Sequence, residues 1–234
     1  MPRPSFAPVS PQLSAPVPTS DTDQQQVLVF DLFGVIADVQ DPAGQRHLEE
    51  LAGVSTATED SREDSRRNFW DAYWSRRPGY DRGEITGQQY WTELGRDLGL
   101  PITSVLAARL IDADVQSWSR IDQSMVNLLR GLHANGRRLA LLSNAPHEIA
   151  AAMRAQHAWL EIFTAVVFSC EVGAAKPAPA AYEAVEAAIG PTGPGFLMID
   201  DRRENVTAAH EHGWAGTHFS GPVSLTASLH DETP

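Results

Sequence analysis

The chain has 234 residues, of which 42% are hydrophobic, so it is long enough to bury one sizeable core and a smaller inserted unit. Its formal net charge is −12, from 30 acidic and 18 basic residues, and this balance opposes binding to nucleic acid, whose phosphates attract clustered positive charge. A single cysteine excludes an intramolecular disulfide and predicts a reducing, cytoplasmic location. The longest apolar runs have the length of strands, so we expect no membrane partner.

The N-terminal segment is rich in proline, serine and threonine and contains no continuous apolar stretch. A secretory signal requires such a stretch. We therefore expect residues 1–26 to form a disordered tail.

The first predicted strand, Val27–Phe30, is a continuous β-prone run that ends at Asp31. Beyond it, residues 42–114 contain only helical patterns, which cover residues 45–51, 61–76, 88–98 and 104–112. Gly79, Gly83 and Gly87 predict a loop between the second and third of these helices. We therefore expect residues 42–114 to form a helical subdomain inserted into a core of residues 27–41 and 115–234.

The rest of the chain alternates between helical patterns and short buried runs. The predicted strands are Leu139–Leu142, Val166–Phe168 and Phe196–Ile199, and the predicted helices cover residues 123–134, 146–157, 178–189 and 204–212. Such alternation predicts an α/β fold, in which a parallel sheet carries helices on both faces. In these sheets ligands bind at the carboxyl ends of the strands, where polar residues follow most of the runs.

Two of these strand ends carry residues suited to nucleophilic chemistry and anion binding. Asp31 follows a buried strand, where an unpaired carboxylate has little stability to offer, so we interpret it as a nucleophile rather than a loop cap. Ser143 and Asn144 precede a predicted helix, whose free N–H groups and hydroxyl cradle anions, although an ordinary helix cap has the same pattern.

The other candidates are a lysine and a pair of carboxylates. Lys176 is the only lysine among the 18 basic residues, which favours a role that needs a compact ammonium group. Asp200 and Asp201 are adjacent at a strand end and repel each other unless a cation intervenes. We predict a Mg²⁺ site formed by Asp200, Asp201 and Asp31, with Asn205 supporting these ligands.

The segments Phe-Asp31-Leu-Phe33-Gly-Val, Leu-Leu-Ser143-Asn144, Lys176-Pro and Ile-Asp200-Asp201 resemble the four signature motifs of the haloacid dehalogenase superfamily. Their order and the helical insertion after the first motif also match. The resemblance implies a Rossmann-like core with a type-one helical cap. It further implies catalytic roles for Asp31, Ser143 and Lys176, and contacts between substrate and Phe33, Gly34 and Asn144.

Two departures from the family pattern point in opposite directions. Phosphatases of the family keep an acid two residues after the nucleophile, where this chain has Phe33, and dehalogenases of the family have an aromatic residue there. Those dehalogenases lack the metal, however, and do not carry the pair Asp200 and Asp201. Because clustered carboxylates are costly without a cation, the metal-binding interpretation is given more weight.

The favoured function is therefore Mg²⁺-dependent phosphoryl transfer through an aspartyl phosphate at Asp31, on a small phosphorylated molecule whose leaving group needs little protonation. One alternative is a metal-independent 2-haloacid dehalogenase, for which Arg76, Arg77 or Arg82 would bind the substrate carboxylate, although surface positions are expected for all three. Another is a non-catalytic binding or regulatory protein. His147 is a candidate substitute acid, although an ordinary role in a first helical turn is favoured.

Overall fold

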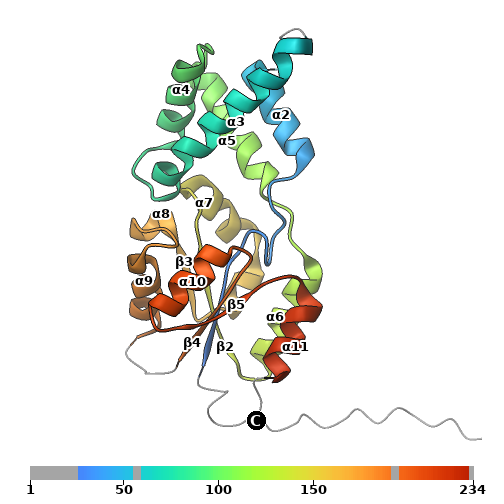
Figure 1. The fold of residues 1–234 in the computed structure, drawn as a ribbon, viewed down its shortest axis with the longest axis vertical. Coiled ribbons are helices and arrows are strands. Elements are labelled where there is room, and N and C mark those ends of the chain that lie inside the picture. Colours follow the sequence, from blue (N-terminus) through green and yellow to red (C-terminus); the bar gives the residue numbers. More distant parts are fainter. Residues whose placement is uncertain (1–25, 55–58, 191–194, 232–234) are drawn as a thin grey trace, which may run out of the picture.

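A computed structural model describes residues 26–54, 59–190 and 195–231 (Figure 1). The predicted tail therefore lies outside the described residues, apart from Gln26. No helix in the described part of the chain combines the length and apolar character needed to cross a membrane.

A five-stranded parallel sheet forms the centre of the larger lobe, with the strand order β3-β2-β1-β4-β5. The strands are β1 (Val27–Phe30), β2 (Arg138–Ser143), β3 (Ala165–Phe168), β4 (Phe196–Asp200) and β5 (Ala215–His218). The predicted α/β fold with a parallel sheet is confirmed. The sequence did not predict β5, a partly exposed edge strand.

Alternate residues of the inner strands pack against different helices, which explains why these strands are apolar throughout. Leu28 and Phe30 face a core built with α6 (Gln123–Ala134), α7 (His147–Gln156) and the short 3₁₀ helix η2 (Ala158–Ile162). Val27 and Val29 face the opposite side, where α9 (Pro179–Ile189) and α10 (Arg203–Glu211) cover the sheet. Two further helices are α8 (Ser169–Val172) and α11 (Pro222–Asp231).

Four helices between β1 and α6 form a second lobe, seen at the top of Figure 1, which we call the helical insert. They are α2 (Pro42–Ala52), α3 (Glu59–Asp81), α4 (Gly87–Leu98) and α5 (Ser104–Ser117). The insert has a hydrophobic core of its own, centred on buried aromatic residues such as Phe69, Tyr73 and Trp91. Its last helix ends at Ser117, three residues beyond the expected boundary at residue 114.

Helix α3 is longer than the sequence pattern indicated. The pattern predicted a helix that ends near Arg76 and a loop that starts at Gly79, but the helix continues through Pro78 to Asp81. Tertiary contacts explain the extension, because the ring of Tyr80 stacks on the ring of Tyr90, with the ring centroids 4.5 Å apart. The added turn also contains an ion pair between Arg77 and Asp81, and it brings these residues to the junction of the two lobes.

Candidate active site

The carboxyl ends of the central strands bring most of the predicted residues to one edge of the sheet. Asp31 follows β1, while Ser143 ends β2 and Asp200 ends β4. The chain leaves β1 toward β2 on one side and reaches β4 on the other, so this edge is the switch point at which parallel sheets bind ligands. A cavity of about 180 Å³ lies here, and its core-side wall includes Asp31, Phe33, Asn144, Lys176, Asp201 and Asn205.

Lys176 is buried between two carboxylates. Its Nζ atom lies 2.9 Å from Oδ1 of Asp31 and 2.7 Å from Oδ2 of Asp200. Burial alone would lower the pKa of Lys176, but the two carboxylates raise it above its usual value, so the ammonium group stays charged. Burial raises the pKa of Asp31 to about 7, although Lys176 acts to lower it.

Asp200 is fully buried, and both of its carboxylate oxygens have partners. Oδ1 accepts hydrogen bonds from the backbone N–H of Arg202 at 2.8 Å and from Nδ2 of Asn205 at 3.0 Å. Oδ2 accepts from Nζ of Lys176 at 2.7 Å and from the same amide of Asn205 at 3.0 Å. Asp200 therefore orients Lys176, and Asn205 in turn orients Asp200.

Asp201 is arranged differently, because its Oδ1 is buried and has no hydrogen-bond partner among the described residues. Burial and then the neighbouring Asp200 raise the pKa of Asp201. Oxygen atoms of Asp31, Asp200 and Asp201 lie within 4.8 Å of one another. Gly34 has a φ of 86° and leaves room for Asp201, since a Cβ at Gly34 would lie 2.3 Å from Oδ2 of Asp201. The cluster has the donor set of a magnesium site.

The residues at the end of β2 take two different positions. Ser143 is fully buried, and its Oγ atom has no hydrogen-bond partner in the described part of the chain. The side chain of Asn144 is bonded on both sides to the backbone of Lys176, because its Nδ2 donates to the carbonyl at 2.8 Å and its Oδ1 accepts from the N–H at 2.9 Å. Asn144 thus fixes the loop that carries the lysine.

Aromatic rings and residues of the insert make up most of the remaining cavity lining. Phe33 lies beside the nucleophile and meets Trp118 edge-on, with ring centroids 4.9 Å apart. Trp74 of α3 also lines the cavity and lies 6.3 Å from Trp118. Arg77 and Asp81, one turn apart on α3, complete this part of the lining.

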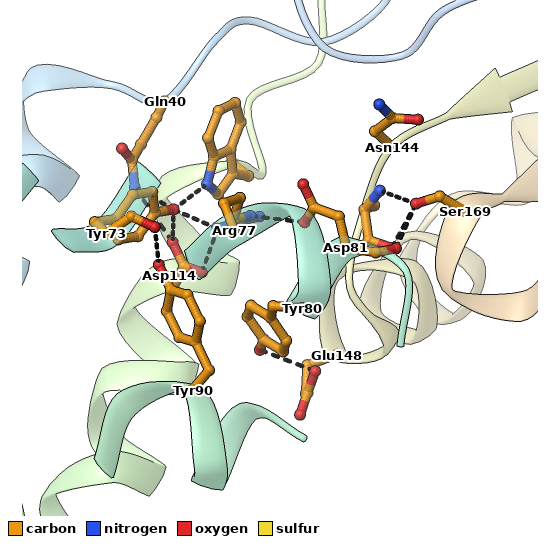
Figure 2. Close-up of polar contacts among 12 residues, drawn as sticks. Gln40, Tyr73, Arg77, Tyr80, Asp81, Tyr90, Asp114, Asn144, Glu148 and Ser169 are labelled. Carbon is orange, nitrogen blue, oxygen red and sulfur yellow. Dashed lines mark hydrogen bonds and ion pairs between the residues drawn. The ribbon is translucent and has the colours of Figure 1, made fainter. Parts of the chain in front are cut away.

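Arg77 is buried, which corrects the expectation that it lies on the surface. Its Nε donates to Oδ1 of Asp81 at 2.7 Å, and its Nη1 lies 3.0 Å from Oδ2 of Asp114 (Figure 2). Arg76 and Arg82 instead pair with acidic residues outside the cavity wall. The charge of Arg77 is therefore already balanced within the insert.

His147, the candidate substitute acid, is not among the described residues that line the cavity. Its ring lies against the loop after α3, where a Cβ at Gly83 would be 2.8 Å from Nε2 of His147. Trp118 and Asp81 line the cavity without having been predicted from the sequence. The spacing of Arg77 and Asp81, opposite charges four residues apart, was the available signal, because such pairs share one face of a helix.

Residues 25–213, more than half of the chain, match the family model of haloacid dehalogenase-like hydrolases. The chain therefore belongs to the haloacid dehalogenase-like hydrolase family. It is 27% identical to the sesquiterpene phosphatase astK of Aspergillus oryzae over 150 residues, which are 64% of this chain and 75% of that protein.

Solved structures share the same fold. A HAD family enzyme of Bacteroides thetaiotaomicron, in complex with magnesium and inorganic phosphate, has a TM-score of 0.63 and 20% identity, over 83% of this chain and 94% of that chain. The L-2-haloacid dehalogenase of Xanthobacter autotrophicus, with chloropropionic acid covalently bound, has a TM-score of 0.56 and 19% identity, over 89% of this chain and 83% of that chain. Since both phosphate-bound and dehalogenase structures share it, the fold does not choose between the two reactions.

Proposed function

We propose that this chain is a Mg²⁺-dependent phosphatase that hydrolyses small phosphate monoesters through an aspartyl phosphate at Asp31. The observation that carries the proposal is the buried, unpartnered Oδ1 of Asp201 beside Asp31. With Asp200 the site contains three carboxylates against the single ammonium of Lys176. A divalent cation would balance the remaining negative charge, whereas a metal-independent enzyme has no use for Asp201.

The hydrogen bonds of the cluster divide the roles among its members. Both oxygens of Asp200 already have partners, so we assign the metal to Asp31 and Asp201 and give Asp200 the task of holding Lys176. Bound Mg²⁺ would offset the charge of the phosphoryl oxygens and of the attacking carboxylate. The free Oγ of Ser143 is suited to donate a hydrogen bond to a phosphoryl oxygen.

Two predicted contacts with substrate take a more specific form in this proposal. The backbone N–H of Gly34 donates to the carbonyl of Ala37 at 2.7 Å, so Gly34 contributes space for Asp201 rather than a hydrogen bond. Asn144 acts through the loop of Lys176, to which its side chain is bonded. Lys176 keeps its charge beside Asp31 and would also attract the phosphoryl group.

The aromatic part of the cavity lining favours a substrate whose organic part is apolar. Phe33, Trp74 and Trp118 form an aromatic surface within a cavity of about 180 Å³. A cavity of roughly 150 Å³ holds a benzene molecule in another protein, so the space suits a compact organic group. The sesquiterpene phosphatase astK, to which this chain is 27% identical, is named for an apolar class of substrate, which agrees with this lining.

Dehalogenation remains the second candidate because of one observation, the aromatic residue Phe33 in place of the acid. The environment of Arg77 opposes it, however. A 2-haloacid carries a carboxylate that needs a cation, and Arg77 is already paired with Asp81 and Asp114. Arg77 is thus committed to partners within the insert and offers no free cation to a carboxylate substrate.

The test compares the two reactions in one preparation. We expect hydrolysis of p-nitrophenyl phosphate that depends on Mg²⁺ and stops on chelation, together with a melting temperature raised by Mg²⁺ and beryllofluoride. Asp31→Asn is the control, since an amide cannot form the covalent intermediate. Chloride release from 2-chloropropionate without metal, with no phosphatase activity, would replace the proposal by the dehalogenase alternative.

A further inference from the structure

The end of helix α3 places a carboxylic acid in the wall of the catalytic cavity. Asp81 is the last residue of α3, and Asp31, Asn144 and Lys176 line the same cavity from the core. Among the described residues of that wall, Asp81 is the one carboxylate that the insert contributes. It therefore lies on the side where the organic part of a phosphate ester would extend when its phosphoryl group is at Asp31.

One oxygen of Asp81 is anchored and the other is available. Oδ1 accepts a hydrogen bond from Nε of Arg77 at 2.7 Å. Figure 2 shows the second oxygen pointing away from the guanidinium, with no interaction drawn to it. The side chain is 15% exposed, in contrast to 1% for Asp114, the other partner of Arg77. Asp81 is thus held in one orientation while part of its carboxyl group faces the cavity.

The charges around Asp81 favour a bound proton. Arg77 is one cation between two carboxylates, Asp81 and Asp114, so the buried group has a net charge of −1 when both acids are ionised. Burial raises the pKa of Asp81, although Arg77 acts to lower it. The other charged groups around this position are Arg82 next to it in the chain and Asp31, Lys176, Asp201 and Arg202 on the cavity wall.

Contacts between the insert and the core fix the position of this acid. The backbone carbonyl of Asp81 accepts a hydrogen bond from Oγ of Ser169 at 2.5 Å. One residue earlier, the hydroxyl of Tyr80 donates to Oε2 of Glu148 at 2.9 Å (Figure 2). Oε1 of Glu148 also accepts a hydrogen bond from the backbone N–H of Gly87 at 3.2 Å. These bonds hold the last turn of α3 against the core, on the same side as the catalytic residues.

We propose that Asp81 is the general acid of this enzyme and donates to the leaving oxygen the proton that Phe33 cannot supply. The inference rests on the proposed phosphatase function. In the first step a carboxylate oxygen of Asp31 bonds to phosphorus, the bond from phosphorus to the ester oxygen breaks with its electron pair on that oxygen, and the proton of Asp81 converts it to an alcohol.

The second step frees the carboxylate of Asp31, and Asp81 regains its proton. A water oxygen bonds to phosphorus, the bond between phosphorus and Asp31 breaks, and the electron pair returns to the Asp31 carboxylate. The water releases its proton to solvent, and Asp81, where the first step has ionised it, recovers a proton from solvent, so this step does not depend on Asp81. The products are inorganic phosphate and an alcohol. Because Asp81 protonates the leaving oxygen, the enzyme would also hydrolyse esters whose alkoxide leaves poorly, and not activated phosphates alone.

The test is the dependence of rate on the leaving group in the full-length, Mg²⁺-loaded protein. The substrates are 2-phenylethyl phosphate, whose alkoxide needs a proton, and p-nitrophenyl phosphate, whose phenolate leaves without one. We expect Asp81→Asn to lower turnover of the alkyl ester by ~10²–10⁴-fold and to leave the aryl ester nearly unchanged. Asp81→Glu should restore part of the loss. Asp97→Asn is the matched control, because Asp97 also pairs with an arginine of the insert but lies outside the cavity.

A pH profile adds a measurement that a purely structural role would not change. If Asp81 must be protonated, turnover of the alkyl ester by the wild type falls as pH rises, and Asp81→Asn removes that decline. Equal losses for both esters, or no loss for either, would overturn the role of Asp81 while the phosphatase activity stands. If the wild type hydrolyses neither ester, the proposed function itself fails, and the inference fails with it.

Discussion

The Nζ atom of Lys176 lies 2.9 Å from Oδ1 of Asp31, and both side chains are buried at the carboxyl end of β1. The lysine reaches this position from a loop fixed by Asn144. It therefore meets the proposed nucleophile as a compact charge in a site with little spare room. A planar guanidinium cannot take the same place, because it is larger and directs its donors as a fork.

We expect Lys176→Arg to lower turnover of p-nitrophenyl phosphate by ~10²–10³-fold, the size of effect seen when one electrostatic donor of an active site is lost. The measurement is steady-state kinetics at saturating Mg²⁺. Arg154→Lys is the matched control, since it exchanges the same two residue types in an exposed ion pair with Glu171. Wild-type rates in Lys176→Arg would show that the ammonium has no special role.

The pKa of Asp31 predicts how metal binding depends on pH. In the folded protein this pKa is raised to about 7, above its usual value of 3.8, so between these two values the folded state binds a proton that the unfolded state releases. Without metal, stability should therefore fall as pH rises from about 4 to about 7 and then level off. Mg²⁺ competes with this proton, so its stabilising effect should grow over the same interval.

Thermal melting with and without Mg²⁺, at pH about 5.5 and about 8, measures this linkage. The shift in melting temperature should be larger at the higher pH, and Asp31→Asn should weaken the dependence. A Mg²⁺ effect that does not change with pH would mean that Asp31 is not a ligand.

Asp200 and Asp201 are neighbours in the chain, but their replacement by alanine should change the stability of the metal-free protein by different amounts. Asp200→Ala deprives Lys176 and Asn205 of a buried partner, and breaking such a pair costs about 3–5 kcal/mol of folding free energy. Asp201→Ala removes a carboxylate whose Oδ1 has no described partner, so the metal-free protein should lose little stability.

Urea unfolding without metal measures the loss of stability in each variant. The Mg²⁺-induced shift in melting temperature measures how far each variant still binds the metal. We expect Asp201→Ala to abolish that shift, whereas Asp200→Ala weakens it less. The assignment of the metal to Asp201 is wrong if Asp201→Ala responds to Mg²⁺ as the wild type does.

The sequence predicted the α/β sheet because its inner strands are apolar on both faces and leave a strong local pattern. Edge strand β5, with the sequence Ala-Gly-Thr-His, needs no apolar run, since it is partly exposed. The end of α3 was missed because Pro78 and Gly79 suggest a helix end, while stacking of Tyr80 on Tyr90 extends the helix. Tertiary packing decides such cases.

Most of the candidate site followed from residues at strand ends, whose positions the topology fixes. The contribution of the insert did not follow, because the contacts between the lobes depend on packing that no local pattern records. The burial of Arg77 is one example, since three arginines lie within seven residues and one alone enters the cavity wall. The division of labour between Asp200 and Asp201 also required the hydrogen bonds of each oxygen.

Phe33 lies on the core side of the same cavity as Asp81. In the background Asp81→Asn, the additional change Phe33→Asp should restore turnover of 2-phenylethyl phosphate by at least roughly tenfold, since a positioned acid contributes ~10²–10⁴-fold. Turnover of p-nitrophenyl phosphate should not rise. The change also removes an edge-on contact with Trp118 at 4.9 Å, so the melting temperature should fall.

Phe33→Asn in the same background is the control, because it has the size and polarity of the aspartate but no proton to donate. Equal rescue by both residues would mean that the smaller side chain, and not the acid, matters. The single variant Phe33→Asp completes the test. If Asp81 already supplies the proton, a second acid on the core side adds little, and the large effect appears when Asp81 is neutralised. A rise as large in the presence of Asp81 as in its absence would show that the leaving group is unprotonated in the wild type, and the restriction to activated phosphates would then hold.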